Sequence, residues 1–310
     1  ALSMTACGGG NSASTDGSSN DGGASASGGS YKVSVILKTL AAEYWQYVKS
    51  GAEDYASEHS DKVTVEVKGP SSETAFDEMQ NMIETDLSSG TYDGIVISPL
   101  QSDTAAQLVS GTKLPIVAID TNFTAPEVKS FVGTGNEAAA KKGGEAAVEA
   151  AKAAGWTDIK CIEIAGVQGD QTNTARMNGY KAGVEEAGGT FLSDEVQYAD
   201  ATADRATTAM EAIMQTHPEG IAIICANNDD MAMAAARAAQ GHDAYKNTIF
   251  LGFNGDRAAC EAILDGQMTM SVAQMAYEMG YKPVETMVQV LDGETVDEFV
   301  DSGSDVVTPD

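Results

Sequence analysis

The chain has 310 residues, enough for one large domain or two medium ones with a sizeable core. Its formal net charge of −28 argues against nucleic-acid binding and against adsorption to anionic lipid, because the phosphates of both would repel the chain. The same charge favours solubility. We therefore expect no nucleic-acid partner.

The first 30 residues differ in composition from the rest. They are mainly Gly, Ser, Ala, Asn and Asp, with few large apolar side chains, which predicts a disordered linker. Cys7 follows small or apolar residues and precedes three glycines, as at the end of a bacterial lipoprotein signal. That resemblance implies cleavage before Cys7 and a diacylglycerol on its sulfur. We expect the lipid to be the only membrane attachment, because no segment reaches the ~18 apolar residues of a membrane-spanning helix.

From residue 31 onward, short apolar runs alternate with amphipathic stretches. Such strands, separated by helices, are typical of parallel sheets covered on both faces, and two rounds of the pattern predict two doubly wound lobes. The predicted strands are Val33–Leu37, Val63–Lys68, Gly94–Ile97, Ile116–Ile119, Ser130–Val132, Ile159–Ile164, Phe191–Val196, Ile221–Cys225, Thr248–Phe253 and Met268–Val272. The clearest predicted helices are Glu73–Leu87, Asn136–Ala154 and Met231–Gln240.

Motifs for catalysis or cofactors do not occur. The sequence contains neither a Gly-rich phosphate loop nor a nucleophile elbow, and its three histidines have no partner pattern. The spacing of Cys161, Cys225 and Cys260 matches no zinc site. We therefore predict that the chain is not an enzyme and holds no metal or cofactor.

Polar and aromatic side chains recur just after the predicted strands, where open α/β sheets bind ligands. Each polar residue alone would be an ordinary cap or turn residue, but their repetition at successive strand ends favours a shared site. Carboxylates, amides and an arginine match vicinal hydroxyls, and flat rings cover the C–H face of a sugar. The Asp170-Gln171 pair, in the loop before Arg176, either contacts the ligand or caps a helix. The candidate ligand-binding residues are Lys38, Tyr44, Trp45, Asp120, Asp170, Arg176, Asn228, Asn254 and Gln274.

A family resemblance rests on several strings in order: V-I-L-K-T-L-A-A-E-Y-W, D-G-I-V-I-S-P-L, A-I-D-T-N, A-R-M-N-G-Y, C-A-N-N-D-D-M-A, L-G-F-N-G and G-Q-M-T-M-S-V-A-Q. Together they resemble type I periplasmic sugar-binding proteins of the ribose, allose and galactose group, and the first is most like D-allose-binding proteins. The resemblance implies two lobes joined by a multi-strand hinge. The N-terminal lobe would be residues 31–133 plus 273–300, and the C-terminal lobe residues 134–272 plus 301–310. The crossovers would lie near Gly133–Gly135, Met270–Val272 and Glu298–Gly303.

The same resemblance assigns roles to the candidate residues. Tyr44 and Trp45 would stack on the sugar beside Lys38, and Asp120 would accept hydrogen bonds from ring hydroxyls. From the second lobe Arg176 and Asn228 would donate, with Asn254 and Gln274 completing the polar shell. Three departures from the family pattern argue against ribose itself: Ala42-Glu43 replaces a common Asn-Pro, Asn254 replaces a carboxylate, and Thr121 stands where ribose receptors have an arginine.

These observations predict an extracytoplasmic, lipid-anchored binding protein of an ABC importer. We expect a monomer that closes on a monosaccharide or polyol and then docks on permease subunits. One alternative is a signalling receptor for the furanone-like autoinducer-2, slightly favoured by the Asp170-Gln171 pair. An enzyme of doubly wound fold is the second alternative, without a supporting motif. A repressor is excluded, because no basic helix-turn-helix precedes the lobes.

Overall fold

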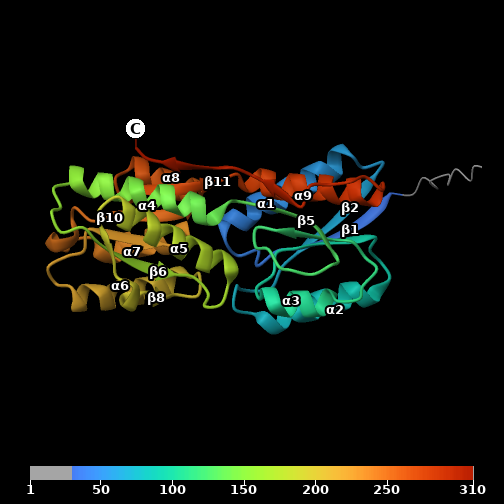
Figure 1. The fold of residues 1–310 in the computed structure, drawn as a ribbon, viewed down its shortest axis with the longest axis horizontal. Helices are drawn as coiled ribbons and strands as arrows, with labels where there is room; N and C mark the ends of the chain where they lie inside the picture. Colours follow the sequence, from blue (N-terminus) through green and yellow to red (C-terminus); the bar gives the residue numbers. More distant parts are fainter. Residues whose placement is uncertain (1–29, 310) are drawn as a thin grey trace, which may run out of the picture.

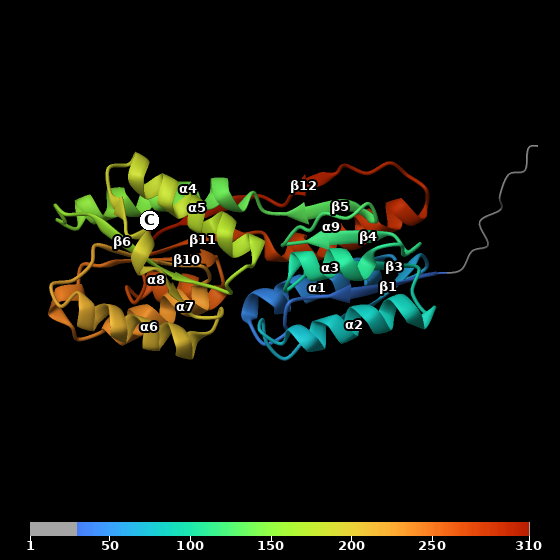
Figure 2. The same ribbon diagram turned by 60° about the horizontal axis from the view of Figure 1, so that its bottom comes forward.

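The structure, a computed structural model, describes residues 30–309. The predicted linker and lipidation site at Cys7 lie outside the described residues. Two lobes lie side by side along the long axis, each built on a largely parallel sheet with helices on both faces (Figures 1 and 2). The predicted α/β class with two doubly wound lobes is therefore confirmed.

The first lobe contains a six-stranded parallel sheet. Helices α1 (Glu43–Glu58) and α9 (Ala276–Leu291) cover one face, and α2 (Phe76–Ser89) and α3 (Ser102–Val109) cover the other. In spatial order the strands are β12 (Phe299–Asp301), β5 (Val128–Gly133), β4 (Ile116–Ile119), β3 (Gly94–Ile97), β1 (Tyr31–Ile36) and β2 (Val63–Lys68).

The second lobe contains a seven-stranded sheet in which only the edge strand β13 is antiparallel to its neighbour. Helices α4 (Asn136–Ala153) and α5 (Gln171–Glu186) cover one face, and α6 (Ala203–Thr216), α7 (Asp229–Ala239) and α8 (Arg257–Leu264) the other. In spatial order the strands are β13 (Ser304–Val307), β11 (Met270–Gln274), β10 (Ile249–Asn254), β9 (Ile223–Ala226), β6 (Lys160–Ala165) and β7 (Thr190–Phe191), with β8 (Gln197–Tyr198) also pairing with β6.

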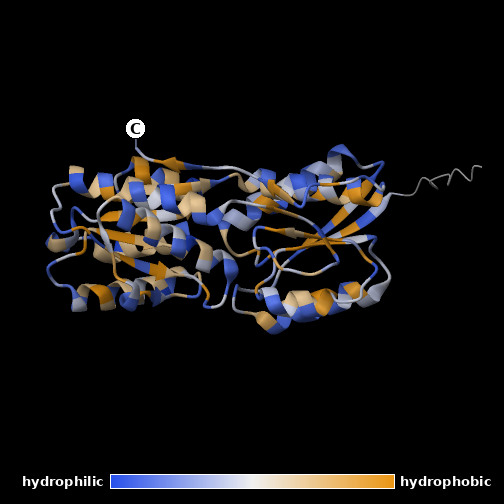
Figure 3. Cartoon of the chain, in the orientation of Figure 1, coloured by the Kyte–Doolittle hydropathy of each residue, from blue (hydrophilic) through white to orange (hydrophobic). Residues whose placement is uncertain are grey.

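The central strands are largely apolar, as Figure 3 shows, and their side chains are buried because helices cover both sides of each sheet. Two helix pairs approach very closely at glycines. A Cβ atom at Gly51 or Gly280 would collide with the backbone of the facing helix in the α1–α9 pair, and one at Gly183 would do so in the α4–α5 pair. Glycine is required there because only a bare Cα lets the helix backbones meet.

Three segments cross between the lobes, and two predicted boundaries shift. The predicted crossover Met270–Val272 is wrong: β11 stays in the second sheet through Gln274, and the chain crosses at Met275. The last crossover is at Ser302–Gly303, because β12 pairs with β5 through Asp301. The first lies between Gly133 and Asn136.

Two predicted elements also need correction. The strand predicted at Phe191–Val196 is broken into β7 and β8 by a 3₁₀ turn at Ser193–Glu195. The helix predicted from Glu73 begins at Phe76, so Glu73 lies in a loop. The apolar periodicity that predicts this helix does not fix its first turn. Within residues 30–309, no helix is both long and apolar enough to cross a membrane.

Candidate functional site

A small cavity lies between the lobes, at the carboxyl ends of β1, β4, β6, β9 and β10. Its volume is about 40 Å³, far smaller than a monosaccharide and enough for only a few water molecules. A sugar can therefore enter only if the lobes separate. The cavity is lined by Lys38, Ala42, Tyr44, Trp45, Glu73, Asp120, Gly166, Val167, Asp170, Thr172, Asn173, Arg176, Ala201, Asn227, Asn228 and Asn254.

An aromatic pair forms the wall on the side of the first lobe. Tyr44 and Trp45 open α1, are nearly fully buried, and meet edge to face with ring centroids 4.9 Å apart. The Tyr44 hydroxyl donates to Asp120 Oδ1 at 3.0 Å, and Trp45 Nε1 donates to Glu73 Oε1 at 3.1 Å. Burial, followed by the charge of Asp120, raises the pKa of Tyr44 well above its usual value, so the hydroxyl stays protonated. Both polar edges are thus held, which fixes the orientation of the rings.

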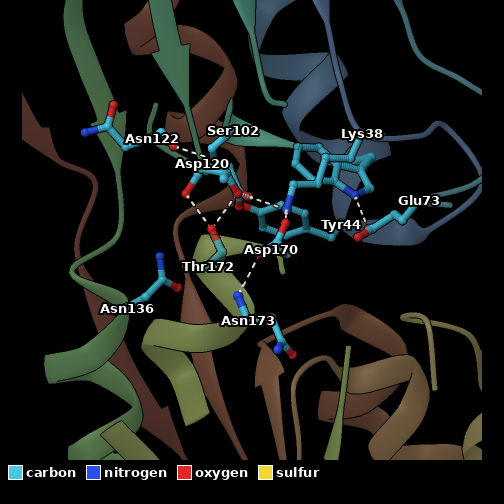
Figure 4. A network of polar contacts seen from close by, with 12 residues as sticks. Lys38, Tyr44, Glu73, Ser102, Asp120, Asn122, Asn136, Asp170, Thr172 and Asn173 are labelled. Carbon is cyan, nitrogen blue, oxygen red and sulfur yellow. Dashed lines mark hydrogen bonds and ion pairs between the residues drawn. The ribbon is translucent and has the colours of Figure 1, made fainter. Parts of the chain in front are cut away.

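An ion pair spans the two lobes across the cavity (Figure 4). Lys38, two residues beyond β1, places its Nζ 2.5 Å from Asp170 Oδ2 and 3.9 Å from Asp120 Oδ2. Burial lowers the pKa of Lys38, but the charges of Asp170, Asp120 and, to a smaller extent, Glu73 outweigh burial and leave this pKa raised. Asp170 also caps α5 by accepting from the Asn173 backbone N–H at 2.7 Å.

Arg176 is held by the second lobe on three sides. Its Nε donates to Asn136 Oδ1 and its Nη1 to the Asn227 carbonyl, both at 2.8 Å. The guanidinium lies over the ring of Phe253, 3.8 Å from the centroid. The side chain is therefore rigid and aimed at the cavity by buried partners.

The three predicted amides differ in their positions. Asn254 lines the cavity, but its Oδ1 accepts from Gln274 Nε2 at 2.9 Å and its Nδ2 donates to Asp256. Gln274 lies outside the cavity lining and anchors Asn254, while accepting from Thr134 Oγ1 at 2.9 Å. Asn228 lines the cavity and at the same time caps α7 through the Met231 N–H.

Backbone strain marks two of these positions. Asp120 has φ +60° and Asn254 has φ +138°, in the region that favours glycine. Each directly ends or follows a strand at the cavity. Non-glycine residues keep such conformations only where the surroundings impose them, and such positions concentrate at functional sites.

Buried carboxyl groups lie behind the site in the second lobe. Glu163, in the middle of β6, is fully buried, and no described residue donates a hydrogen bond to its oxygens. Burial raises the pKa of Glu163 to about 8. Burial also raises the pKa of Asp256 to about 8 and that of Asp229 to about 6. The interior behind the cavity-lining residues therefore holds two carboxyl groups, those of Glu163 and Asp256, that are largely protonated at neutral pH.

Sequence reasoning missed four polar lining residues. Thr172 and Asn173 lie in the first turn of α5, directly after the predicted Asp170, and Asn227 precedes the predicted Asn228. Glu73 was missed because the sequence pattern places it in the predicted helix Glu73–Leu87, whereas it lies in the loop before α2. Of the Asp170-Gln171 pair, Asp170 both lines the cavity and caps α5, whereas Gln171 is the first residue of α5 and does not line the cavity. No cluster of potential metal ligands occurs in the part of the chain that the structure describes.

Comparison with known proteins identifies the family. The periplasmic binding protein domain matches residues 33–295, so the chain belongs to that family. The D-allose-binding periplasmic protein of Escherichia coli K12 is 30% identical over 264 residues, covering 82% of each chain. The ribose import binding protein of the same strain is 28% identical over 268 residues, covering 85% of this chain and 86% of that protein.

A solved structure has the same fold. The carbohydrate transporter solute binding protein from Agrobacterium radiobacter, in complex with D-arabinose, has a TM-score of 0.81 at 26% identity and covers 90% of this chain and 94% of that one. These named relatives are binding proteins, in agreement with the prediction that the chain is not an enzyme.

Proposed function

We propose that this chain is the extracytoplasmic substrate-binding protein of an ABC importer and that it binds a monosaccharide or related polyol between its lobes. The observation that carries the proposal is the cavity itself, closed by both lobes and lined by an aromatic pair, a fixed arginine and convergent carboxylates and amides. Two relatives named for ribose and allose, and a solved structure in complex with D-arabinose, support a sugar ligand.

Binding proceeds by hinge closure in this proposal. Three short crossovers allow the lobes to move as bodies, and contacts such as Lys38–Asp170 and Thr121–Thr172 form only when they meet. Closure removes water from the polar shell, so a sugar hydroxyl left without a partner weakens binding. This is how such a site would discriminate between epimers.

The test is thermal unfolding of the chain against aldopentoses, aldohexoses, polyols and autoinducer-2. A ligand at 100 times its Kd adds about 2.7 kcal/mol to the free energy of unfolding. We expect a clear rise in Tm with one sugar or polyol and little with its epimers. A response only to autoinducer-2 would favour the signalling alternative, and a flat panel would contradict a sugar receptor.

Membrane attachment through Cys7 and docking on a permease complete the proposal. The support for a lipid anchor is the sequence around Cys7 together with the glycine- and serine-rich stretch that follows. We expect fatty-acid labelling of the wild-type precursor in cells, and release of a Cys7→Ser variant from the membrane fraction. Equal labelling of both would contradict the anchor.

We expect the receptor to act as a monomer, which light scattering would check.

A further inference from the structure

The charges that line the cavity do not balance. Three carboxyl groups, Glu73, Asp120 and Asp170, face two cations, Lys38 and Arg176. Lys38 pairs with Asp170 at 2.5 Å and lies 3.9 Å from Asp120, so its charge is shared by those two carboxylates. The third carboxylate, Glu73, is left without a cation. Glu73 is only partly buried, so water still reaches its carboxylate, and a cation carried by a bound ligand would take the place of that water.

Glu73 has one side-chain partner among the described residues. Its Oε1 accepts from Trp45 Nε1 at 3.1 Å, and it forms no ion pair within 4.0 Å. Burial raises the pKa of Glu73, and the pull of Lys38 only partly offsets this effect. Figure 4 shows Glu73 on the first lobe, set apart from the Lys38–Asp170–Asp120 cluster. The carboxylate therefore has unused acceptor capacity where a ligand would lie.

The second cation cannot neutralise Glu73. Arg176 is fixed by Asn136, the Asn227 carbonyl and the ring of Phe253, all in the second lobe. A cation beside Glu73 would instead come from the ligand.

We propose that Glu73 selects a ligand that carries a protonated amine, such as an amino sugar or amino polyol, by pairing the ammonium group with its carboxylate. This inference rests on the proposed function, because it places the amine on a polyhydroxylated ligand bound between the lobes. Closure then buries a balanced set of charges, whereas closure on a neutral sugar leaves Glu73 unpaired.

Titration calorimetry measures the Kd of three forms of each of four sugars, D-glucose, D-galactose, D-mannose and D-allose. The three forms are the free sugar, the amino sugar and the N-acetylated amino sugar. For at least one of the four, we expect the amino sugar to bind about tenfold more tightly than both neutral forms, which corresponds to about 1.4 kcal/mol. Glu73→Gln keeps an acceptor for Trp45 Nε1 but removes the charge, so we expect the ratio of the amino-sugar Kd to the neutral-sugar Kd to return to about one.

The control is Glu84→Gln, an identical charge change on the exposed surface of α2 that should leave the preference intact. Neutral sugars that bind as tightly as their amino forms, or a preference that survives Glu73→Gln, would overturn the inference alone. No binding by any of these sugars would overturn the inference, and no binding by the aldopentoses and polyols as well would overturn the proposed function.

Discussion

Replacing Lys38 by methionine should weaken ligand binding far more than it weakens the fold. The substitution removes the cation that lies 2.5 Å from Asp170 and 3.9 Å from Asp120, and all three side chains are at most 7% exposed. Two charges 4 Å apart interact with about 4 kcal/mol at an effective dielectric constant near 20. Loss of one partner of a buried pair typically costs about 3–5 kcal/mol.

This penalty applies to the closed arrangement, because the carboxylates regain water when the lobes separate. We therefore expect the Kd for the identified sugar to rise roughly a hundredfold, the equivalent of about 2.7 kcal/mol. The free energy of unfolding should fall by only about 1 kcal/mol, which is the largest stabilisation that a solvent-exposed ion pair typically gives. Titration calorimetry and urea unfolding measure the two quantities.

Two variants sharpen this test. Lys62→Met removes an exposed lysine that pairs with Asp292 at 3.8 Å, and it should leave the Kd unchanged. Adding Asp170→Asn to Lys38→Met should recover part of the lost affinity, since asparagine still caps α5 and no longer buries an unpaired charge. A Kd for Lys38→Met within about threefold of wild type would refute a closed-state role for this ion pair.

Three further predictions concern other parts of the site. Arg176→Ala leaves Asn136 Oδ1 and the Asn227 carbonyl without their donor, which costs about 1–3 kcal/mol for each acceptor. We therefore expect a lower free energy of unfolding in urea as well as a loss of sugar binding. An unchanged free energy of unfolding would contradict this prediction. Because Asp120 has φ +60°, Asp120→Gly should be about 1 kcal/mol more stable than Asp120→Ala, and equal stability would show that the conformation is unstrained. Burial raises the pKa of Glu163 from 4.5 to about 8, so the folded state holds a proton that the unfolded state releases. The contribution of Glu163 to the free energy of unfolding is therefore fully present below pH 4.5. Between pH 4.5 and pH 8 it falls by about 1.4 kcal/mol per pH unit. Glu163→Gln should lack that decline, and parallel stability–pH curves for the two proteins would contradict it.

Much of this architecture could be predicted from local pattern. The strands that end before Lys38 and Asp120 are short apolar runs, and parallel sheets bring their carboxyl ends to one edge. The aromatic pair at Tyr44 and Trp45 was placed at the same edge for the same reason. Element ends were less certain, as the late start of α2 shows, because the apolar period says little about the first turn.

The partnerships inside the site could not be predicted in this way. Lys38 and Asp170 are far apart in the sequence and meet only through the relative placement of the lobes. Glu73 belongs to a loop whose contact with Trp45 leaves no local signature. For Gln274, the sequence indicated polarity at a strand end, but whether an amide faces the ligand or a neighbouring amide depends on tertiary packing.

The central claim is that both lobes enclose a polyhydroxylated ligand against the aromatic wall. Its most direct test is titration calorimetry of the full neutral and amino sugar panel with the wild type and with Trp45→Ala. We predict one-to-one binding of one sugar or its amino form to the wild type, and loss of that binding in a Trp45→Ala protein that remains folded. No binding to the wild type, or equal binding to both proteins, would contradict the account.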